Sequence, residues 1–292
     1  MKRCVNNNLR EAAKRGEIKI AVHQGVFHAD DVTAVALLKS FLVELLGEKV
    51  KVVIERVTHQ QKDFKEFDLV LDVGGKYDGV KYFDHHQWTK EENLHAAAGL
   101  VWEAIKKALS LGEEYSSLEE LIEIIDAADI GVRPAQKWEY PNLISRFNAS
   151  DIYSEIQEQQ FLKAVAFAEE IIKNLKEGAK EIKKAKAIAK NIKNLENEGL
   201  PEVVELPEFS RLWNQFINGR KTPGIEAVIW FDKNQNCYKA QVVPVAPGSF
   251  QRVGKGFKPD TTGKMSFVHP GEFFCVAPDR TTLINYLKKH FK

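Results

Sequence analysis

Residues 18–46 read IKIAVHQGVFHADDVTAVALLKSFLVELL and combine three patterns in one continuous stretch. Residues 18–23 form an apolar run of strand length that ends in a histidine. From residue 29 to residue 46 the apolar residues recur at helical spacing, and Gly47 follows as a stop signal. The stretch therefore predicts a strand, a short polar loop and a helix, which together begin a βαβ unit.

The same alternation continues outward from this unit. Further strands are predicted at residues 51–57, 67–73 and 80–84, and helices at residues 95–111 and 117–128. Residues 1–16 are polar and basic and predict a short helix or an arm. Strands that alternate with helical patterns indicate an α/β fold, with a mostly parallel, doubly wound sheet and helices on both faces.

The pattern changes after residue 150. Residues 151–200 are helical in pattern and lysine-rich, and they predict a connector of one or two long helices with Gly178 as a candidate break. Residues 201–292 contain β-like segments and a closing helical segment. The expected domains are therefore a catalytic domain at 1–150, a helical connector at 151–200 and a smaller substrate-binding α+β domain at 201–292.

The composition of the 292 residues excludes several classes of protein. With 44% hydrophobic and 28% charged residues, the chain has the composition of a folded globular protein rather than a disordered one. Its net charge is only +1, so any contact with nucleic acid needs a local patch. The three cysteines form no CxxC motif, and no apolar run approaches the ~20 residues of a membrane span. We therefore expect a cytoplasmic protein with no membrane segment.

Segments rich in histidine and aspartate follow three of the predicted strands, and a fourth ends the helix that begins near residue 117. Ligands of open α/β sheets bind beyond the carboxyl ends of the strands, so these segments are expected to meet in one crevice. The candidate metal ligands are His23, His28, Asp30, Asp72 and His85, together with Asp126 or Asp129.

This donor set indicates which ions would bind. Imidazole and carboxylate without thiolate suit Mn²⁺, Fe²⁺, Co²⁺ or Zn²⁺. Six protein ligands exceed the needs of one catalytic ion with an open position, so they predict two divalent ions that share a bridging carboxylate, about 3.5–4 Å apart. Such a pair can hold a bridging hydroxide as a nucleophile and stabilise charge on a phosphoryl oxygen.

Each segment also has a simpler interpretation when it is taken alone. Asp30 and Asp31 are suited to capping the helix that follows them. Asp72 lies shortly before Gly74 and Gly75, a composition typical of turns. Four such segments at the same edge of one sheet are harder to explain by capping and turns. Their combination favours a metal centre.

Several of these segments resemble a known family. Asp84-His85-His86 is the signature of the DHH phosphoesterase superfamily. The segments VHQGVFHADD, DVGGKYD, FDHHQ and AAAGLVW are similar to the MYG family of metal-dependent exonucleases. The resemblance continues at residues 238–252 and 265–273 and therefore spans nearly the whole chain.

The resemblance implies a role for each matched residue. The implied metal ligands are His23, His28, Asp30, Asp72 as the bridging ligand, His85 and Asp129, with Asp126 as the alternative to Asp129. His86 would contact the phosphate as an electrophile or acid, and Asp84 would orient the histidine pair. Relatives usually have Asp-Glu where this chain has Asp30-Asp31.

The matched segments of the second domain contain the candidate substrate contacts Gln251, Arg252 and His269. A guanidinium group holds a phosphate through two parallel hydrogen bonds, which makes Arg252 the natural phosphate ligand among them. The resemblance implies that this domain supplies substrate contacts to the catalytic domain.

The expected function is a two-metal phosphodiesterase that acts as a 3′–5′ exonuclease on RNA or single-stranded nucleic acid. Mn²⁺ is the expected ion, with Co²⁺, Fe²⁺, Zn²⁺ and Mg²⁺ as alternatives. The polarity and the preference for RNA come from the resemblance alone. Two alternatives remain: a phosphohydrolase of a small substrate such as pyrophosphate or a short oligonucleotide, and a non-catalytic, metal-stabilised binding protein. The oligomeric state is open, with a homodimer as one option.

Overall fold

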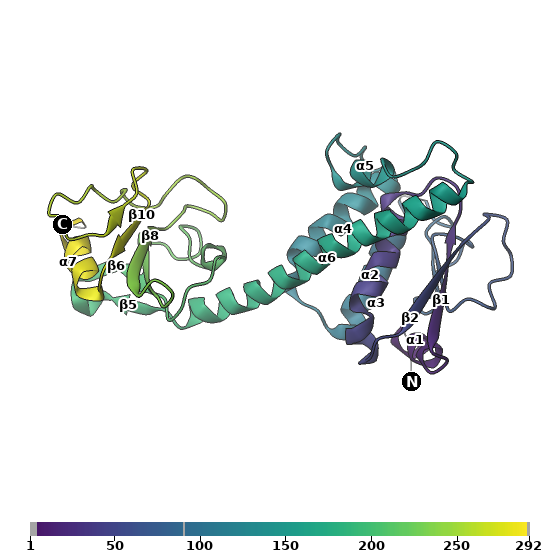
Figure 1. Ribbon diagram of the computed structural model, residues 1–292, viewed down its shortest axis with the longest axis horizontal. Helices are drawn as coiled ribbons and strands as arrows, with labels where there is room; N and C mark the ends of the chain where they lie inside the picture. Colours follow the sequence, from purple (N-terminus) through teal and green to yellow (C-terminus); the bar gives the residue numbers. More distant parts are fainter. Residues whose placement is uncertain (1–4, 90, 291–292) are drawn as a thin grey trace. The chain divides into compact units, whose positions relative to one another are not determined.

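The computed structural model describes residues 5–89 and 91–290, and the chain divides into two compact units, residues 1–178 and residues 179–292 (Figure 1). The expected domain boundaries near residues 150 and 200 stay a prediction. Residues 1–4 of the expected N-terminal helix or arm lie outside the described residues. Within the described part of the chain, no helix is both long and apolar enough to cross a membrane.

The N-terminal unit is built on a four-stranded parallel sheet. Its strands are β1 (Glu17–His23), β2 (Lys51–Val57), β3 (Leu69–Leu71) and β4 (Tyr82–Phe83), in the spatial order β2-β1-β3-β4. β1 is central, because Ile20 pairs with Ile54 of β2 and with Leu69 of β3. This sheet confirms the predicted α/β class with a parallel sheet. β3 and β4 are shorter than the predicted strands.

Helices pack on one face of this sheet (Figure 1). They are α1 (Val5–Ala13), α2 (Ala29–Leu46), α3 (Ala97–Leu109), α4 (Ser116–Asp129), α5 (Tyr140–Ser145) and the first part of α6 (Glu155–Lys190), with a short 3-10 turn, Glu113–Tyr115, before α4. Ile20 and Val22 of β1 point into this layer and share a buried core with Phe41 and Trp102. Burial of these side chains is the main favourable free-energy contribution to the unit.

A loop covers the opposite face of the sheet, where the sequence predicts further helices. Val57 and Val70 point to this face and pack against Phe64 and Phe67, which belong to residues 58–68. The chain steps from β1 to β2 in one direction and from β2 to β3 in the other. Because both connections are right-handed, the β1–β2 and β2–β3 connections lie on opposite faces of the sheet. The β2–β3 connection is a loop because residues 58–68 lack helical periodicity.

Polar groups fix the ends of the central helices. α2 stops at the predicted glycine, since Gly47 has a φ of +83° and its N–H donates to the Val43 carbonyl at 2.7 Å. At the start of α3, the carboxylate of Asp126 accepts a hydrogen bond from the Ala96 N–H at 3.0 Å. Gly99 lies directly against this carboxylate, so a Cβ at that position would overlap its oxygens.

Most of the predicted connector is one continuous helix, α6, which passes through Gly178 without a break. Residues 193–200, which the sequence predicts as helical, instead contain a short strand, a 3-10 turn and the start of a second strand. Phe161 and Val165 near its start are buried in the core of the N-terminal unit. Ile188 near its end is buried in a core of the C-terminal unit, beside Trp213. The helix therefore contributes to the packing of each unit.

The C-terminal unit is an α+β structure, as predicted. Its strands are β5 (Lys193–Leu195), β6 (Leu200–Glu205), β7 (Ala227–Asp232), β8 (Cys237–Val242), β9 (Phe267–Val268) and β10 (Phe274–Ala277), in the order β5-β6-β7-β8-β10-β9. The pairs are antiparallel except β6 with β7. Helix α7 (Arg280–His290) buries Leu283 and Leu287 against the sheet, and two 3-10 turns lie at Glu196–Glu198 and Trp213–Gln215.

Two glycine substitutions are expected to change stability in opposite directions. Gly99→Ala should lower the free energy of unfolding by about 1–3 kcal/mol, because the added methyl group overlaps the buried Asp126 carboxylate. Gly178→Ala is the matched control, since its added methyl group meets no atom within 4 Å inside a helix. It should raise the free energy of unfolding by about 0.5–1 kcal/mol. Urea unfolding followed by circular dichroism measures both, and stabilisation by Gly99→Ala would contradict this packing.

Candidate metal centre

The loop that leaves β1 carries the first group of candidate ligands, and side chains from distant segments hold it. Asn148 makes two hydrogen bonds to the backbone of Phe27, at 3.0 Å to its N–H and 2.9 Å to its carbonyl. The fully buried Gln157 donates to the carbonyl of Gly25 at 2.8 Å. These hydrogen bonds to backbone N–H and carbonyl groups hold the loop of residues 24–28 in place before α2 begins.

Asp72 occupies the centre of the candidate site. It follows β3 directly, with a φ of +53°, a left-handed conformation that is costly for a residue with a side chain and is common at functional sites. Its Oδ2 lies 3.2 Å from Nε2 of His23. Its Oδ1 lies 3.6 Å from Nε2 of His85 and 3.5 Å from Nδ1 of His86. The two oxygens of one carboxylate thus face two different groups of histidines.

The Asp84-His85-His86 segment follows β4. The buried Asp84 carboxylate accepts a hydrogen bond from the Gly75 N–H at 2.6 Å and one from the His86 ring at 2.7 Å. These bonds outweigh burial, which acts in the opposite direction, and hold the pKa of Asp84 below its usual value. The same hydrogen bond raises the pKa of His86. Asp84 therefore holds Nδ1 of His86, and among the described residues no hydrogen bond engages Nε2 of that ring.

Of the two candidates for the last ligand position, Asp129 lies beside the other candidate ligands, whereas Asp126 lies beside His95. Asp129 ends α4, and its Oδ2 lies 3.3 Å from Nε2 of His85. Donor atoms of His28, Asp30 and Asp129 all lie within 4.8 Å of one another. Asp126 lies one turn earlier and binds the His95 ring at 2.8 Å, so its carboxylate is engaged at the start of α3 instead.

One buried carboxyl group of this site, that of Asp30, lacks the partners that buried charges normally have. Asp30 is completely buried, and neither of its oxygens accepts a hydrogen bond from a described donor. Burial, followed by the negative charges of Asp72 and Asp129, raises the pKa of Asp30 well above its usual value. Burial and the charge of Asp72 also raise the pKa of Asp129. An unpaired buried carboxylate is expensive, and a bound cation would remove that cost.

His23 carries the opposite signature. Burial lowers the pKa of its imidazole, but hydrogen bonds to Asp31 and Asp72 outweigh burial and raise that pKa to about 11. The ring is therefore protonated at neutral pH in the protein without a cation. A metal ion binds the neutral ring, so metal binding would release this proton.

These residues fit divalent metal ions. Imidazole and carboxylate donors gather in three adjoining groups, His23 with Asp31 and Asp72, Asp72 with Asp84, His85 and His86, and His28 with Asp30 and Asp129. Asp72 belongs to two of the groups. Every predicted ligand of the N-terminal unit is part of this cluster, with Asp129 in place of its alternative.

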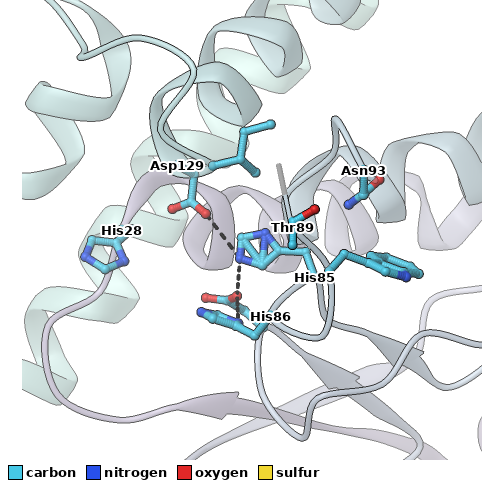
Figure 2. Close-up of a pocket in the computed structure, with 9 residues that line it drawn as sticks. His28, His85, His86, Thr89, Asn93 and Asp129 are labelled. Carbon is cyan, nitrogen blue, oxygen red and sulfur yellow. Dashed lines mark ion pairs between the residues drawn. The ribbon is translucent and has the colours of Figure 1, made fainter. Parts of the chain in front are cut away.

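A cavity of about 310 Å³ opens on the cluster. Figure 2 shows His28, His85, His86 and Asp129 facing one another, with Thr89 and Asn93 on the side of His85 away from His28. Trp88 and Ile130 complete much of the wall. The volume of the cavity is large enough for a phosphate group and part of a nucleotide, and candidate ligands line it: His28, Asp72, His85 and Asp129.

Sequence reasoning missed several residues of this site. Asp31 is predicted as a helix cap and is absent from the candidate ligands; it does accept a hydrogen bond from the His28 N–H at 3.0 Å, but its other oxygen lies 3.1 Å from Nε2 of His23. His59 stacks on the His23 ring with centroids 5.0 Å apart. Arg56 donates to the carbonyl of His23 at 3.2 Å. The adjacency of Asp31 to Asp30 was the one available signal, since the other two contacts depend on the sheet.

The three candidate substrate contacts lie in the C-terminal unit. Arg252 donates to the Gly271 carbonyl at 2.6 Å, and its guanidinium lies 5.0 Å from the centre of the Phe273 ring. The His269 ring packs against the same Phe273 ring, and the two ring centroids lie 4.3 Å apart. Gln251 precedes Arg252 and is exposed. The structure thus brings Arg252 and His269 together around one ring, and their contact with substrate stays a prediction.

The chain matches a known family over most of its length. Residues 19–258 match the family model MYG1_exonuc, which is described as Uncharacterised protein family (UPF0160). This match covers more than half of the chain.

Individual relatives match either over most of the chain at lower identity or over a shorter part of it at higher identity. A MYG1 exonuclease of Rattus norvegicus is 26% identical over 276 residues, 80% of this chain and 71% of that protein. A MYG1 protein of Chlamydia muridarum is 31% identical over 166 residues, 54% of each chain. A MYG1 protein of Schizosaccharomyces pombe is 32% identical over 136 residues, so the match spans 39% of this chain and only 40% of that relative. The match to the Saccharomyces cerevisiae MYG1 protein covers 38% of its length.

Among solved structures, RecJ of Thermus thermophilus in complex with Mg²⁺ is similar to this chain. The sequence identity is 15% and the TM-score is 0.28, over 98% of this chain and 50% of the RecJ chain.

Asp30→Asn should separate metal binding from folding. In metal-stripped protein it should raise the free energy of unfolding by about 1–3 kcal/mol, because it removes a buried carboxyl group whose ionisation is opposed by burial and by the charges of Asp72 and Asp129. It should also reduce the stabilisation by Mn²⁺, which for one site of the unchanged protein is about 2.7 kcal/mol at a free concentration 100 times Kd.

The control for this substitution is Asp126→Asn, a second buried carboxylate that binds His95 outside the cluster. It should keep the response to Mn²⁺. Thermal unfolding with EDTA or with Mn²⁺ measures both variants, and a full Mn²⁺ response in Asp30→Asn would show that Asp30 is no ligand.

Proposed function

This chain belongs to the MYG1 exonuclease family (UPF0160), and from that membership and its histidine–aspartate cluster we propose that it is a metal-dependent phosphodiesterase that shortens RNA from the 3′ end. Relatives of the family carry the name exonuclease, including the proteins of Bos taurus and Rattus norvegicus. The direction of cleavage and the choice of RNA rest on the resemblance of the motifs. The family membership supports the reaction class.

The observation that carries the proposal is the position of Asp72 between two groups of imidazoles. Its Oδ2 faces His23 at 3.2 Å, and its Oδ1 faces His85 at 3.6 Å. A carboxylate so placed is suited to bridge two ions. Two ions that share Asp72 would be held by the candidate ligands, with Mn²⁺ as the preferred metal: His23, His28, Asp30, Asp72, His85 and Asp129.

The residues around the cluster have distinct tasks in this reaction. Two divalent ions supply Lewis-acid stabilisation of the phosphoryl oxygens and an activated water. Asp84 holds Nδ1 of His86, so Nε2 of that ring is available to donate a hydrogen bond to the phosphate or a proton to the leaving oxygen. The His86 side chain is 59% exposed, so it can reach a substrate in the cavity. Gln251, Arg252 and His269 would contact the strand from the C-terminal unit.

A second candidate function is hydrolysis of a small phosphate substrate such as pyrophosphate. The net charge of +1 and the cavity of about 310 Å³ favour it, since neither provides an extended cationic track for a strand. A purely structural metal site would not require an exposed histidine held by a buried aspartate. That arrangement favours both enzymatic functions over a binding protein.

Two further expectations accompany the proposal. We expect action in the cytoplasm, and the buried free thiols of Cys237 and Cys275 agree with a reducing compartment. A homodimer stays a prediction.

The test is hydrolysis of single-stranded RNA labelled at its 5′ end, with metal-stripped protein and added Mn²⁺. We expect Mn²⁺-dependent products that shorten progressively from the 3′ end. Pyrophosphate is supplied in a parallel reaction. Intact RNA together with rapid pyrophosphate hydrolysis would replace the proposed function by the second candidate.

His86→Ala should lower kcat by about 10²- to 10⁴-fold while Mn²⁺ still binds, because the variant removes a proton donor and leaves the assigned ligands. His95→Ala is the matched control: its side chain is 43% exposed and paired with the buried Asp126 at 2.8 Å, much as His86 is paired with Asp84. It should retain activity within a few-fold. Equal losses in the two variants would contradict the role of His86, and calorimetric titration with Mn²⁺ tests whether metal binding is intact.

A further inference from the structure

The C-terminal unit contains a second cavity, of about 320 Å³, beside the most exposed large apolar side chain in the described residues. Phe250 is 99% exposed and lines this cavity. A single exposed apolar residue needs no special explanation. Its meaning here comes from the loop that presents it and from the other side chains of the cavity.

The loop holds Phe250 outward by its own backbone bonds. Pro244 and Arg252 pair across its base, and the Val245 N–H donates to the carbonyl of Gln251 at 2.9 Å. Gly248 has a φ of +71°, which allows the chain to reverse without strain. The ring is therefore presented to solvent by a closed turn.

Phe273 provides a second aromatic surface in the same cavity. The guanidinium of Arg252 lies over this ring at 5.0 Å, and one of its N–H groups is held by the Gly271 carbonyl. A guanidinium fixed over an aromatic ring offers a flat surface that is suited to stacking, and its remaining N–H groups are suited to a phosphate. Arg252 is the one charged residue among those described as lining the cavity.

Two side-chain amides complete the donor and acceptor groups. Asn214 and Gln241 line the cavity, and within the described part of the chain neither side-chain amide has a hydrogen-bond partner. An amide group presents a donor and an acceptor side by side, which matches the edge of a nucleobase. A cavity for an inorganic phosphate or pyrophosphate would require more positive charge than Arg252 provides.

We propose that this cavity binds one nucleobase of a single-stranded nucleic acid, stacked against Phe250 and bonded at its edge by Asn214 and Gln241, with Arg252 on the adjoining phosphate. Bases of single strands are commonly recognised by aromatic stacking and by hydrogen bonds to their edges. The inference rests on the proposed function in that the strand is the substrate. It adds a recognition site that reads the base, whereas the metal centre acts on the phosphate.

The test is binding of a hydrolysis-resistant 2′-O-methyl phosphorothioate oligoadenylate of eight residues to the full chain with Mn²⁺, followed by fluorescence anisotropy. An abasic oligonucleotide of the same length and backbone is the second probe. Phe250→Ala should raise Kd for the oligoadenylate by about 5- to 100-fold, the range expected for one stacked base, and leave Kd for the abasic strand unchanged. Because the ring is fully exposed, its removal should preserve the fold.

Phe267→Ala is the matched control, since this phenylalanine of the same unit is 45% exposed on β9. It should bind both probes as the unchanged protein does. Gln241→Ala should weaken oligoadenylate binding as well, without an effect on the abasic strand. Unchanged oligoadenylate binding in Phe250→Ala, or an equal loss with the abasic strand, would overturn the proposal.

The outcome is separable from that of the hydrolysis experiment. Base-dependent binding that requires Phe250, with no RNA hydrolysis, would support this site and contradict the proposed exonuclease. RNA hydrolysis with no dependence of binding on Phe250 would contradict this site and support the exonuclease.

Discussion

The crowding of buried carboxylates at the carboxyl end of the parallel sheet governs the rest of the N-terminal unit. Asp72 emerges from β3 in a left-handed conformation, which directs its carboxylate between His23 and His85. Asp30 lies nearby without any hydrogen-bond donor among the described residues. Such an arrangement is unfavourable for folding by itself and becomes favourable when cations are bound. When no cation is bound, the surrounding hydrophobic core supplies the free energy that keeps these residues together.

The supporting contacts of this cluster come from segments that are far apart in the sequence. Asn148 and Gln157 hold the loop between His23 and His28, and Gln157 belongs to the first turns of α6. Asp84 fixes His86 from within its own segment. Positions of ligating and catalytic groups must be maintained closely for metal binding and catalysis, and buried hydrogen bonds of this kind maintain them.

The predictable part of the structure is the part set by local patterns. β1, β2 and α2 follow from apolar periodicity, and Gly47 ends α2 where the sequence indicates. The gathering of His23, Asp72 and His85 follows from the rule that parallel strands present their carboxyl ends at one edge. The engagement of Asp126 by His95 could not be predicted, because it depends on how α3 packs beside α4. The loop crossover at residues 58–68 has no periodic signal. The cavity beside Phe250 joins residues as far apart in the sequence as Asn214 and Phe273.

Metal binding at Asp30, as proposed, would also link the lifetime of the protein in a cell to its supply of metal. A chain without bound cations spends more time unfolded, since ligand binding to the folded state no longer draws the equilibrium toward it. Cellular proteases remove unfolded chains, and changes of one to two kcal/mol alter protein abundance several-fold. Metal starvation would therefore reduce the number of molecules as well as the activity of each one. Asp30 would then lower the stability of chains that lack their ions, so that proteases remove those chains first.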